Sequence, residues 1–159
     1  MNEFSFGGFD LNIFFQAVFG NEILNLIRRD TEGQAGLNNQ SAAVKNRWTT
    51  LNTITNVPRP TGSDPNDNRR ISSRFIEDGS FIRLRNISLG YNVPKNWLLR
   101  ARIQQLRIYG SAQNIYTWTN YTGYDPEVGS FNQNPLINGV ENGRYPISSS
   151  YTFGLNVTF

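Results

Sequence analysis

The last thirteen residues of the chain alternate between two kinds of side chain. Over residues 147–159 the odd positions are apolar apart from Ser149, and the even positions are all small or polar. A period of two is the pattern of a β-strand whose two faces meet different surroundings. About 9–11 residues, tilted by about 45°, cross a bilayer as one strand of a barrel. The segment therefore predicts either a lipid-facing strand of an outer-membrane barrel or a half-buried strand of a soluble β-sandwich.

The composition favours an all-β domain and argues against an enzyme. The 159 residues include 11 Phe, 7 Tyr, 14 Gly and 7 Pro, which is a mixture of strand and turn formers. Cysteine and histidine are both absent, which removes thiolate metal sites and the commonest general base. We therefore predict no catalysis, cofactor or metal, and the scattered basic residues do not indicate nucleic-acid binding. The acidic residues considered for catalysis lie at strand ends and turns: Glu77, Asp78, Asp125 and Glu127.

Four segments read as strands, over about residues 4–19, 74–93, 104–119 and 145–159. Within the first, Phe4 and Phe6 have the opposite phase to the residues that follow, and we expect a bulge or kink at Gly7-Gly8. The second segment also reverses phase, which predicts a bulge near residues 84–86 or a portion standing above a membrane. Either interpretation keeps Arg83 and Arg85 out of lipid, where each would cost about 2–4 kcal/mol at the midplane.

The connections between these segments alternate between long and short. Polar segments of about residues 20–73 and 120–144 are read as long loops, with a short helix over residues 21–29, and residues 94–103 form a short turn. Transmembrane barrels have long extracellular loops and short periplasmic turns in alternation. Four strands cannot close a barrel, since single-chain barrels start at eight. No signal peptide opens the sequence, so we expect a soluble protein or a fragment of a longer precursor.

Several motifs resemble one family in particular. Residues 74–94 (RFIEDGSFIRLRNISLGYNVP) resemble a signature segment of the SusC/RagA family, which comprises TonB-dependent transporters of the Gram-negative outer membrane. Trp48 and Pro58-Arg59 resemble a family loop motif, although residues 50–52 are Thr-Leu-Asn where Pro-Glu-Asn is usual. Further similar segments occur in the family order: residues 9–16 (FDLNIFFQ), 106–109 (LRIY), 113–114 (QN), 121–127 (YTGYDPE), 145–146 (YP) and 152–159 (TFGLNVTF).

This resemblance implies both a fold and a function. The chain would supply the last four antiparallel strands of a ~22-stranded barrel, plugged by an N-terminal domain that lies outside this sequence. The whole protein would import oligosaccharides or peptides with a SusD-like surface lipoprotein, and TonB would act through the missing N-terminal region. The aromatic C-terminus would be recognised by the outer-membrane assembly machinery, through Tyr151, Phe153, Leu155, Val157 and Phe159.

Two further sets of residues are candidates for contacts. In the long loops, one set could touch a partner or ligand, or pack within the loops: Trp48, Arg59, Tyr121, Tyr124, Asp125 and Phe131. On the polar side of the strands, another set would face the lumen or the plug: Asn86, Arg107, Tyr109 and Gln113. Two alternatives stay open from the sequence. One is a soluble β-domain that binds a partner through its long loops, and the other is an outer-membrane barrel used for structure or adhesion.

Overall fold

The computed structural model describes residues 1–128 and 138–159, and these form two compact units. The sheet unit consists of Met1–Phe19, Phe81–Thr119 and Ile147–Phe159. The loop unit consists of Gly20–Ser80 together with the described part of Asn120–Pro146. The chain thus passes twice from the sheet unit into the loop unit and back, at the places where the sequence predicts long connections.

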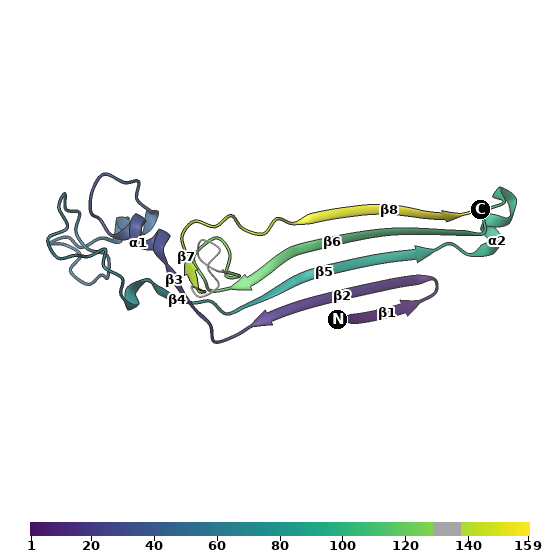
Figure 1. Ribbon diagram of the computed structural model, residues 1–159, viewed down its shortest axis with the longest axis horizontal. Coiled ribbons are helices and arrows are strands. Elements are labelled where there is room, and N and C mark those ends of the chain that lie inside the picture. Colours follow the sequence, from purple (N-terminus) through teal and green to yellow (C-terminus); the bar gives the residue numbers. More distant parts are fainter. Residues whose placement is uncertain (129–137) are drawn as a thin grey trace. The chain divides into compact units, whose positions relative to one another are not determined.

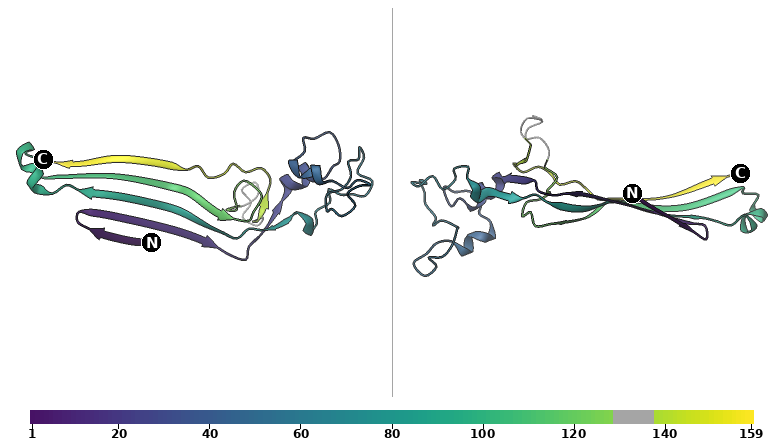
Figure 2. Two further views of the ribbon diagram at one scale, coloured as in Figure 1. Left: turned by 180° about the vertical axis from the view of Figure 1, so that it is seen from behind. Right: turned by 90° about the horizontal axis from the view of Figure 1, so that it is seen from below.

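The sheet unit is a single antiparallel sheet with strand order β1-β2-β5-β6-β8 (Figure 1). Figure 2 shows these strands as one twisted layer, and twist is usual for sheets of L-residues. The sequence predicts a strand over residues 74–93, whereas in the structure the corresponding strand, β5, starts only at Phe81. The strands are β1 (Asn2–Phe6), β2 (Phe9–Val18), β5 (Phe81–Asn92), β6 (Gln105–Thr119) and β8 (Ser150–Thr158).

The structure corrects the predicted single strand over residues 4–19. A two-residue turn separates β1 from β2, and Phe6 pairs with Phe9 across it. Gly7 and Gly8 both have positive φ, 59° and 88°, as a type I′ hairpin turn requires. The phase change at Phe4 and Phe6 marks a reversal of the chain, and it returns both phenylalanines to the face of the sheet that carries Phe9.

We expect Gly8→Val to destabilise the β1–β2 hairpin by about 1–2 kcal/mol, because valine resists positive φ. A Cβ on Gly8 would also lie 3.0 Å from the carbonyl oxygen of Asn92. Gly7→Asn is the matched control, since asparagine tolerates positive φ and a Cβ there meets nothing within 4 Å. Urea unfolding of the whole receptor, refolded into phospholipid vesicles, measures the difference. Equal unfolding midpoints for the two variants would contradict this account of the turn.

The register gathers most of the apolar side chains of the five strands onto one face, although Phe14, Val18 and Phe81 lie on the other. Directly paired residues of an antiparallel sheet point to the same side. One row of paired residues runs Phe4, Leu11, Leu89, Gly110 and Phe153 across the strands. The next row contains Ile13, Ile87, Ala112 and Tyr151, and beyond a bulge come Phe15, Leu84 and Tyr116, then Ala17, Ile82 and Trp118.

A bulge in β5 accounts for the phase reversal predicted there. The pairing between β2 and β5 skips Arg85, because Phe14 pairs with Asn86 while Phe15 pairs with Leu84. Arg83 then falls in the polar row with Gln16 and Thr117, and only 3% of its surface is exposed. Arg85 donates to the side-chain oxygens of Gln16 and Asn114. Arg83 donates to the Thr117 hydroxyl at 2.8 Å, so both arginines bond to polar side chains, and the bulge lies where the sequence predicts one.

Two short helical turns make the connection between β5 and β6. They are α2 (Lys95–Leu98) and the 3₁₀ turn η3 (Leu99–Ala101). Leu98 is buried while Trp97 is 73% exposed. Among the described residues, none of the helices has both the length and the apolar character needed to cross a membrane.

The loop unit is more ordered than its sequence suggests. A small sheet with strand order β4-β3-β7 lies beside one helix, which starts at Leu26 rather than at residue 21. The helix begins where Asn25 accepts a hydrogen bond from the backbone N–H of Arg28, a usual N-cap. The core of the loop unit includes Ile23, Val57, Phe75 and Tyr121. The elements are β3 (Glu22–Asn25), α1 (Leu26–Glu32), η1 (Ala42–Asn46), η2 (Ser73–Phe75), β4 (Ile76–Asp78) and β7 (Val140–Glu141).

Candidate functional site

The apolar face of the sheet unit is exposed, which is unusual for so many large side chains. On β8 alone, Tyr151 is 65%, Phe153 85% and Leu155 65% exposed. The rows in the middle of the face are mainly aliphatic between β2 and β5, with Leu11 beside Leu89 and Ile13 beside Ile87. Aromatic rings flank these rows toward both ends of the strands: Phe9 against Tyr91, then Phe15 against Trp118 and Trp118 against Tyr116.

This order along the strands matches the lipid-facing surface of a transmembrane barrel. Such barrels have an apolar band about 25 Å tall, flanked by aromatic girdles at the two interfaces. A soluble sandwich would instead cover this face with a second sheet. Among the described residues of the sheet unit no such layer exists, because the five strands form a single layer.

The opposite face is polar and carries the four residues predicted to face a lumen or plug. Asn86 and Gln113 are paired in one row, and Arg107 pairs with Asn92 in another. Tyr109 lies in the row between Gly90 and Gly154. All four side chains therefore share one side of the sheet, as predicted. That this side faces a lumen remains a proposal, taken up below.

An ion pair spans three strands of the polar face. Arg107 on β6 donates to both carboxylate oxygens of Asp10 on β2, at 2.5 and 3.3 Å, across the intervening strand β5. The residue of β5 that lies between them is Gly90. A Cβ there would come within 2.6 Å of the Arg107 guanidinium and of both Asp10 oxygens. Gly90 thus leaves the space that the ion pair occupies.

Gly154 makes room in the same way for Tyr109. The two residues are paired between β6 and β8, and a Cβ on Gly154 would overlap the end of the tyrosine ring. Asp10, Gly90 and Gly154 are not among the site residues predicted from the sequence. The sequence does contain a sign of the two glycine sites. Both glycines occupy positions of the polar face, where the alternation otherwise places larger polar residues.

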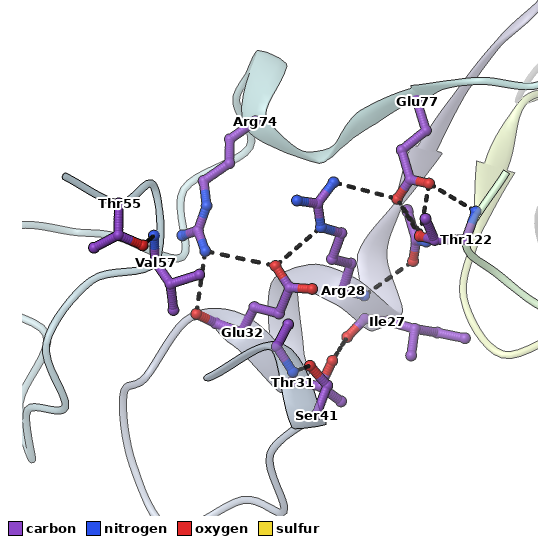
Figure 3. Close-up of polar contacts among 12 residues, drawn as sticks. Ile27, Arg28, Thr31, Glu32, Ser41, Thr55, Val57, Arg74, Glu77 and Thr122 are labelled. Atoms are coloured by element: carbon purple, nitrogen blue, oxygen red, sulfur yellow. Dashed lines mark hydrogen bonds and ion pairs between the residues drawn. The ribbon is translucent and has the colours of Figure 1, made fainter. Parts of the chain in front are cut away.

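In the loop unit, Glu77 is the centre of a polar network that joins three segments (Figure 3). Its carboxylate accepts from the backbone N–H and hydroxyl of Thr122, at 2.7–2.9 Å, and from the Asn25 amide at 3.1 Å. Arg28 of helix α1 donates to the same carboxylate at 3.5 Å. The Glu77 side chain is only 9% exposed. One carboxylate therefore ties β4, the start of α1 and the segment after β6 together.

A second carboxylate extends this network along the helix. Glu32 accepts from Arg28 at 2.9 Å, an i,i+4 pair on α1, and lies 3.6 Å from Arg74. Arg74 also donates to the Glu32 backbone carbonyl at 3.3 Å, as Figure 3 shows. The pairing of two arginines with two mostly buried carboxylates satisfies charges that would otherwise be costly to bury.

We expect the loop unit to lose stability in mild acid. Burial raises the pKa of Glu77, but the hydrogen bonds of Thr122, the charge of Arg28 and the Asn25 amide hold it below its ordinary value of 4.5. The unfolded state then binds more protons, so this stabilisation is complete above about pH 4.5 and is lost as the pH falls through the lower, folded pKa. Hydrogen exchange of residues 20–32, corrected for intrinsic rates, should stay constant from pH 6 to 5 and rise below pH 4.5. Glu77→Gln should remove much of this pH dependence.

Two hollows in the described part of the loop unit are lined mainly by polar residues. The first, of about 570 Å³, is lined by Trp48 and Arg59 of the predicted contact set, together with Arg70 and Arg74. The second, of about 460 Å³, lies between α1, η1 and the segment after β6, and includes Tyr124. Tyr124 is 70% exposed, and Trp48 is 39% exposed. These three members of the predicted set are accessible to another molecule.

Other members of the predicted set have different surroundings. Tyr121 is 6% exposed, and burial together with the charges of Glu141 and Glu77 raises the pKa of its hydroxyl. Its ring therefore belongs to the core of the loop unit and is not an exposed contact. Asp125 accepts from the backbone N–H of Glu127, which makes it a turn residue. Phe131 lies outside the described residues.

Comparisons with known proteins agree over almost the whole chain. No family model matches it. TonB-dependent receptor P3 of Formosa agariphila is 41% identical over 162 residues, covering 99% of this chain and 16% of that protein. TonB-dependent receptor SusC of Bacteroides thetaiotaomicron is 32% identical over 90 residues, which cover 56% of this chain and 8% of that protein. Among solved structures, the RagAB peptide transporter aligns with a TM-score of 0.81 and 31% identity over 98% of this chain and 16% of that one.

The two-faced sheet and these matches define the chain as a segment of a TonB-dependent receptor, a β-barrel protein of the outer membrane. It belongs to the SusC/RagA family within that class. It spans about 16% of the length of the curated relatives it matches most fully. Membership of this family of outer-membrane receptors removes the alternative of a soluble β-domain, and it points away from an enzyme.

Proposed function

We propose that the chain forms part of the wall and the outer loops of an importer for large nutrients, oligosaccharides or peptides. The observation that carries this proposal is the sheet whose one face is apolar and exposed while the other holds the Asp10–Arg107 pair. A wall between lipid and a polar lumen needs these two faces back to back. In this proposal Asn86, Arg107, Tyr109 and Gln113 face the lumen or its plug.

The proposal places the loop unit outside the cell, where a SusD-like lipoprotein would cover it. The similarity to SusC and to the RagAB transporter supports this partner, and the accessible side chains of Trp48, Arg59 and Tyr124 would meet it or the solute. TonB would act through a part of the receptor outside this chain. β8 and Phe159 would serve as the signal for the outer-membrane assembly machinery, through the apolar residues Tyr151, Phe153, Leu155 and Val157.

Growth and uptake test this function directly. A strain without the receptor is grown on single oligosaccharides or peptides as carbon source, beside the same strain carrying the receptor on a plasmid. We expect at least one substrate to need the receptor and its uptake to stop when a protonophore collapses the proton-motive force. The proposal is wrong if every substrate is taken up equally with and without the receptor. A purely structural or adhesive barrel would give that second result.

A further inference from the structure

The first hollow of the loop unit, called here the arginine hollow, has an excess of positive charge. Three guanidinium groups line it, from Arg59, Arg70 and Arg74, against one carboxylate, Asp67. Guanidinium groups bind carboxylates through two parallel hydrogen bonds, which makes them the usual cations at sites for such anions. The charge of the lining therefore favours an anionic ligand.

Two of these cations are available to a ligand. Within residues 1–128 and 138–159, Arg59 is exposed and makes no hydrogen bond or ion pair. Arg70 donates only to the backbone carbonyls of Asn66 and Asp67, at 3.2 and 3.5 Å, and has no carboxylate partner among the described residues. Arg74 also lines the hollow, but it is already paired with Glu32, so less of its charge is available to a ligand. Neighbouring Arg69 is likewise paired, with Asp30 at 2.9 Å, and does not line the hollow.

The loops around the arginine hollow are held in place by their own hydrogen bonds. The backbone N–H of Trp48 donates to the carbonyl of Val57 at 2.9 Å, and the Thr55 hydroxyl donates to the carbonyl of Asn46 at 2.6 Å. On the facing side, Asp64 accepts from the backbone N–H groups of Asn68 and Arg69 at 2.8 and 3.2 Å. A site held in this way loses little conformational entropy when a ligand binds.

The rest of the lining favours a sugar over a peptide. The Trp48 ring offers a partly exposed flat apolar surface, against which the C–H face of a pyranose can pack. Around it lie neutral hydrogen-bonding groups suited to hydroxyls, including Asn56, Asn66, Asn68 and Ser72. The apolar residues of the lining are Trp48, Val57 and Pro58, and Val57 is buried, so the Trp48 ring is the main flat apolar surface that a ligand can reach.

We propose that the arginine hollow binds the carboxylate of a uronic-acid unit in an acidic oligosaccharide, with Arg59 and Arg70 holding the anion and Trp48 stacking on the ring. The inference rests on the proposed role in import, and it assigns one class of solute to one place on the receptor. It adds a capture site to the outer loops and assigns nothing to the lumen.

Equilibrium binding to the whole purified receptor tests this site without any transport step. The probes are tetragalacturonate and tetramannuronate, each beside its methyl ester, which removes the charge and keeps the sugar. The receptor should bind at least one acid at least tenfold more tightly than its ester. Arg59→Gln should weaken that binding about tenfold, as expected for loss of a charge-assisted hydrogen bond. Trp48→Ala should weaken acid and ester alike.

Arg47→Gln is the matched control, because Arg47 is exposed, adjoins Trp48 in sequence and does not line the hollow. It removes the same charge and should change the affinity less than twofold. The inference is overturned by equal binding of acid and ester, by equal losses in R47Q and R59Q, by tighter binding of tetraglutamate, or by no binding of either acid. None of these binding results contradicts import, which the growth test examines. The hypothesis of the capture site can therefore be rejected while the proposed import function stands.

Discussion

Phe153→Arg strongly lowers the amount of folded receptor in the outer membrane, while Thr152→Arg leaves it nearly unchanged. The two positions are neighbours on β8 and both are exposed in the sheet unit, so neither substitution meets a steric obstacle there. They differ in the face they occupy. Phe153 belongs to the apolar row with Leu89 and Gly110, and Thr152 pairs with Ser111 on the polar face.

The size of this effect follows from where the row lies. The row of Phe153 runs between the two aromatic ends of the apolar face, which places it toward the middle of the bilayer. An arginine facing lipid near the midplane costs about 2–4 kcal/mol, a substantial share of the stability of a barrel. The band of folded receptor on unheated electrophoresis gels of outer membranes measures the outcome. Equal amounts of folded receptor for the two variants would contradict the claim that the apolar face contacts lipid and the polar face does not.

Glu77→Gln opens the loop unit locally without unfolding the sheet unit. The substitution keeps the shape of the side chain but removes the charge opposite Arg28 and replaces an acceptor of hydrogen bonds by a donor. Breaking a buried charged pair in this way typically costs about 3–5 kcal/mol. Loss of about 3 kcal/mol would lower hydrogen-exchange protection roughly a hundredfold in the segments that Glu77 joins.

The matched control for this prediction is Asp78→Asn, one residue along β4. Asp78 is exposed, and its carboxylate accepts from the backbone N–H and the side chain of Ser80, which does not belong to the Glu77 network. Its substitution removes the same charge without touching the network. We expect D78N to keep wild-type exchange in residues 21–32 and 121–124, whereas E77Q loses protection there. Similar exchange in the two variants would mean that the Glu77 network does not hold these segments together.

The alternation of side chains predicts the sheet well where strands are regular. In β8 the odd positions share the apolar face, as the sequence indicates, and the same holds for five residues of β6: Leu106, Ile108, Ala112, Tyr116 and Trp118. The hairpin at Gly7-Gly8 was misjudged because a bulge and a two-residue turn both use glycine, and both change the phase of the alternation. Only the pairing of Phe6 with Phe9 separates the two.

The contacts that shape the candidate sites could not be predicted from local patterns. Asp10 and Arg107 are 97 residues apart, and their ion pair depends on the joint register of β2, β5 and β6. Glu77 and Thr122 are 45 residues apart and meet only because the second long connection returns to β4. Apart from the helix predicted over residues 21–29, the sequence of the loop unit predicts irregular structure, because its strands have four residues or fewer and show no period.

The most direct test of the account is to measure which side of β8 faces lipid. The chain has no cysteine, so each residue from Ser150 to Thr158 can be replaced singly by a spin-labelled cysteine, in a whole receptor cleared of any other exposed cysteine. Collision rates with oxygen report lipid, and those with a water-soluble nickel complex report water. We predict high oxygen accessibility at positions 151, 153, 155 and 157, and nickel or protein contact at 150, 152, 154 and 156. Accessibility without a period of two, or with the opposite phase, would contradict the assignment of this sheet as a barrel wall.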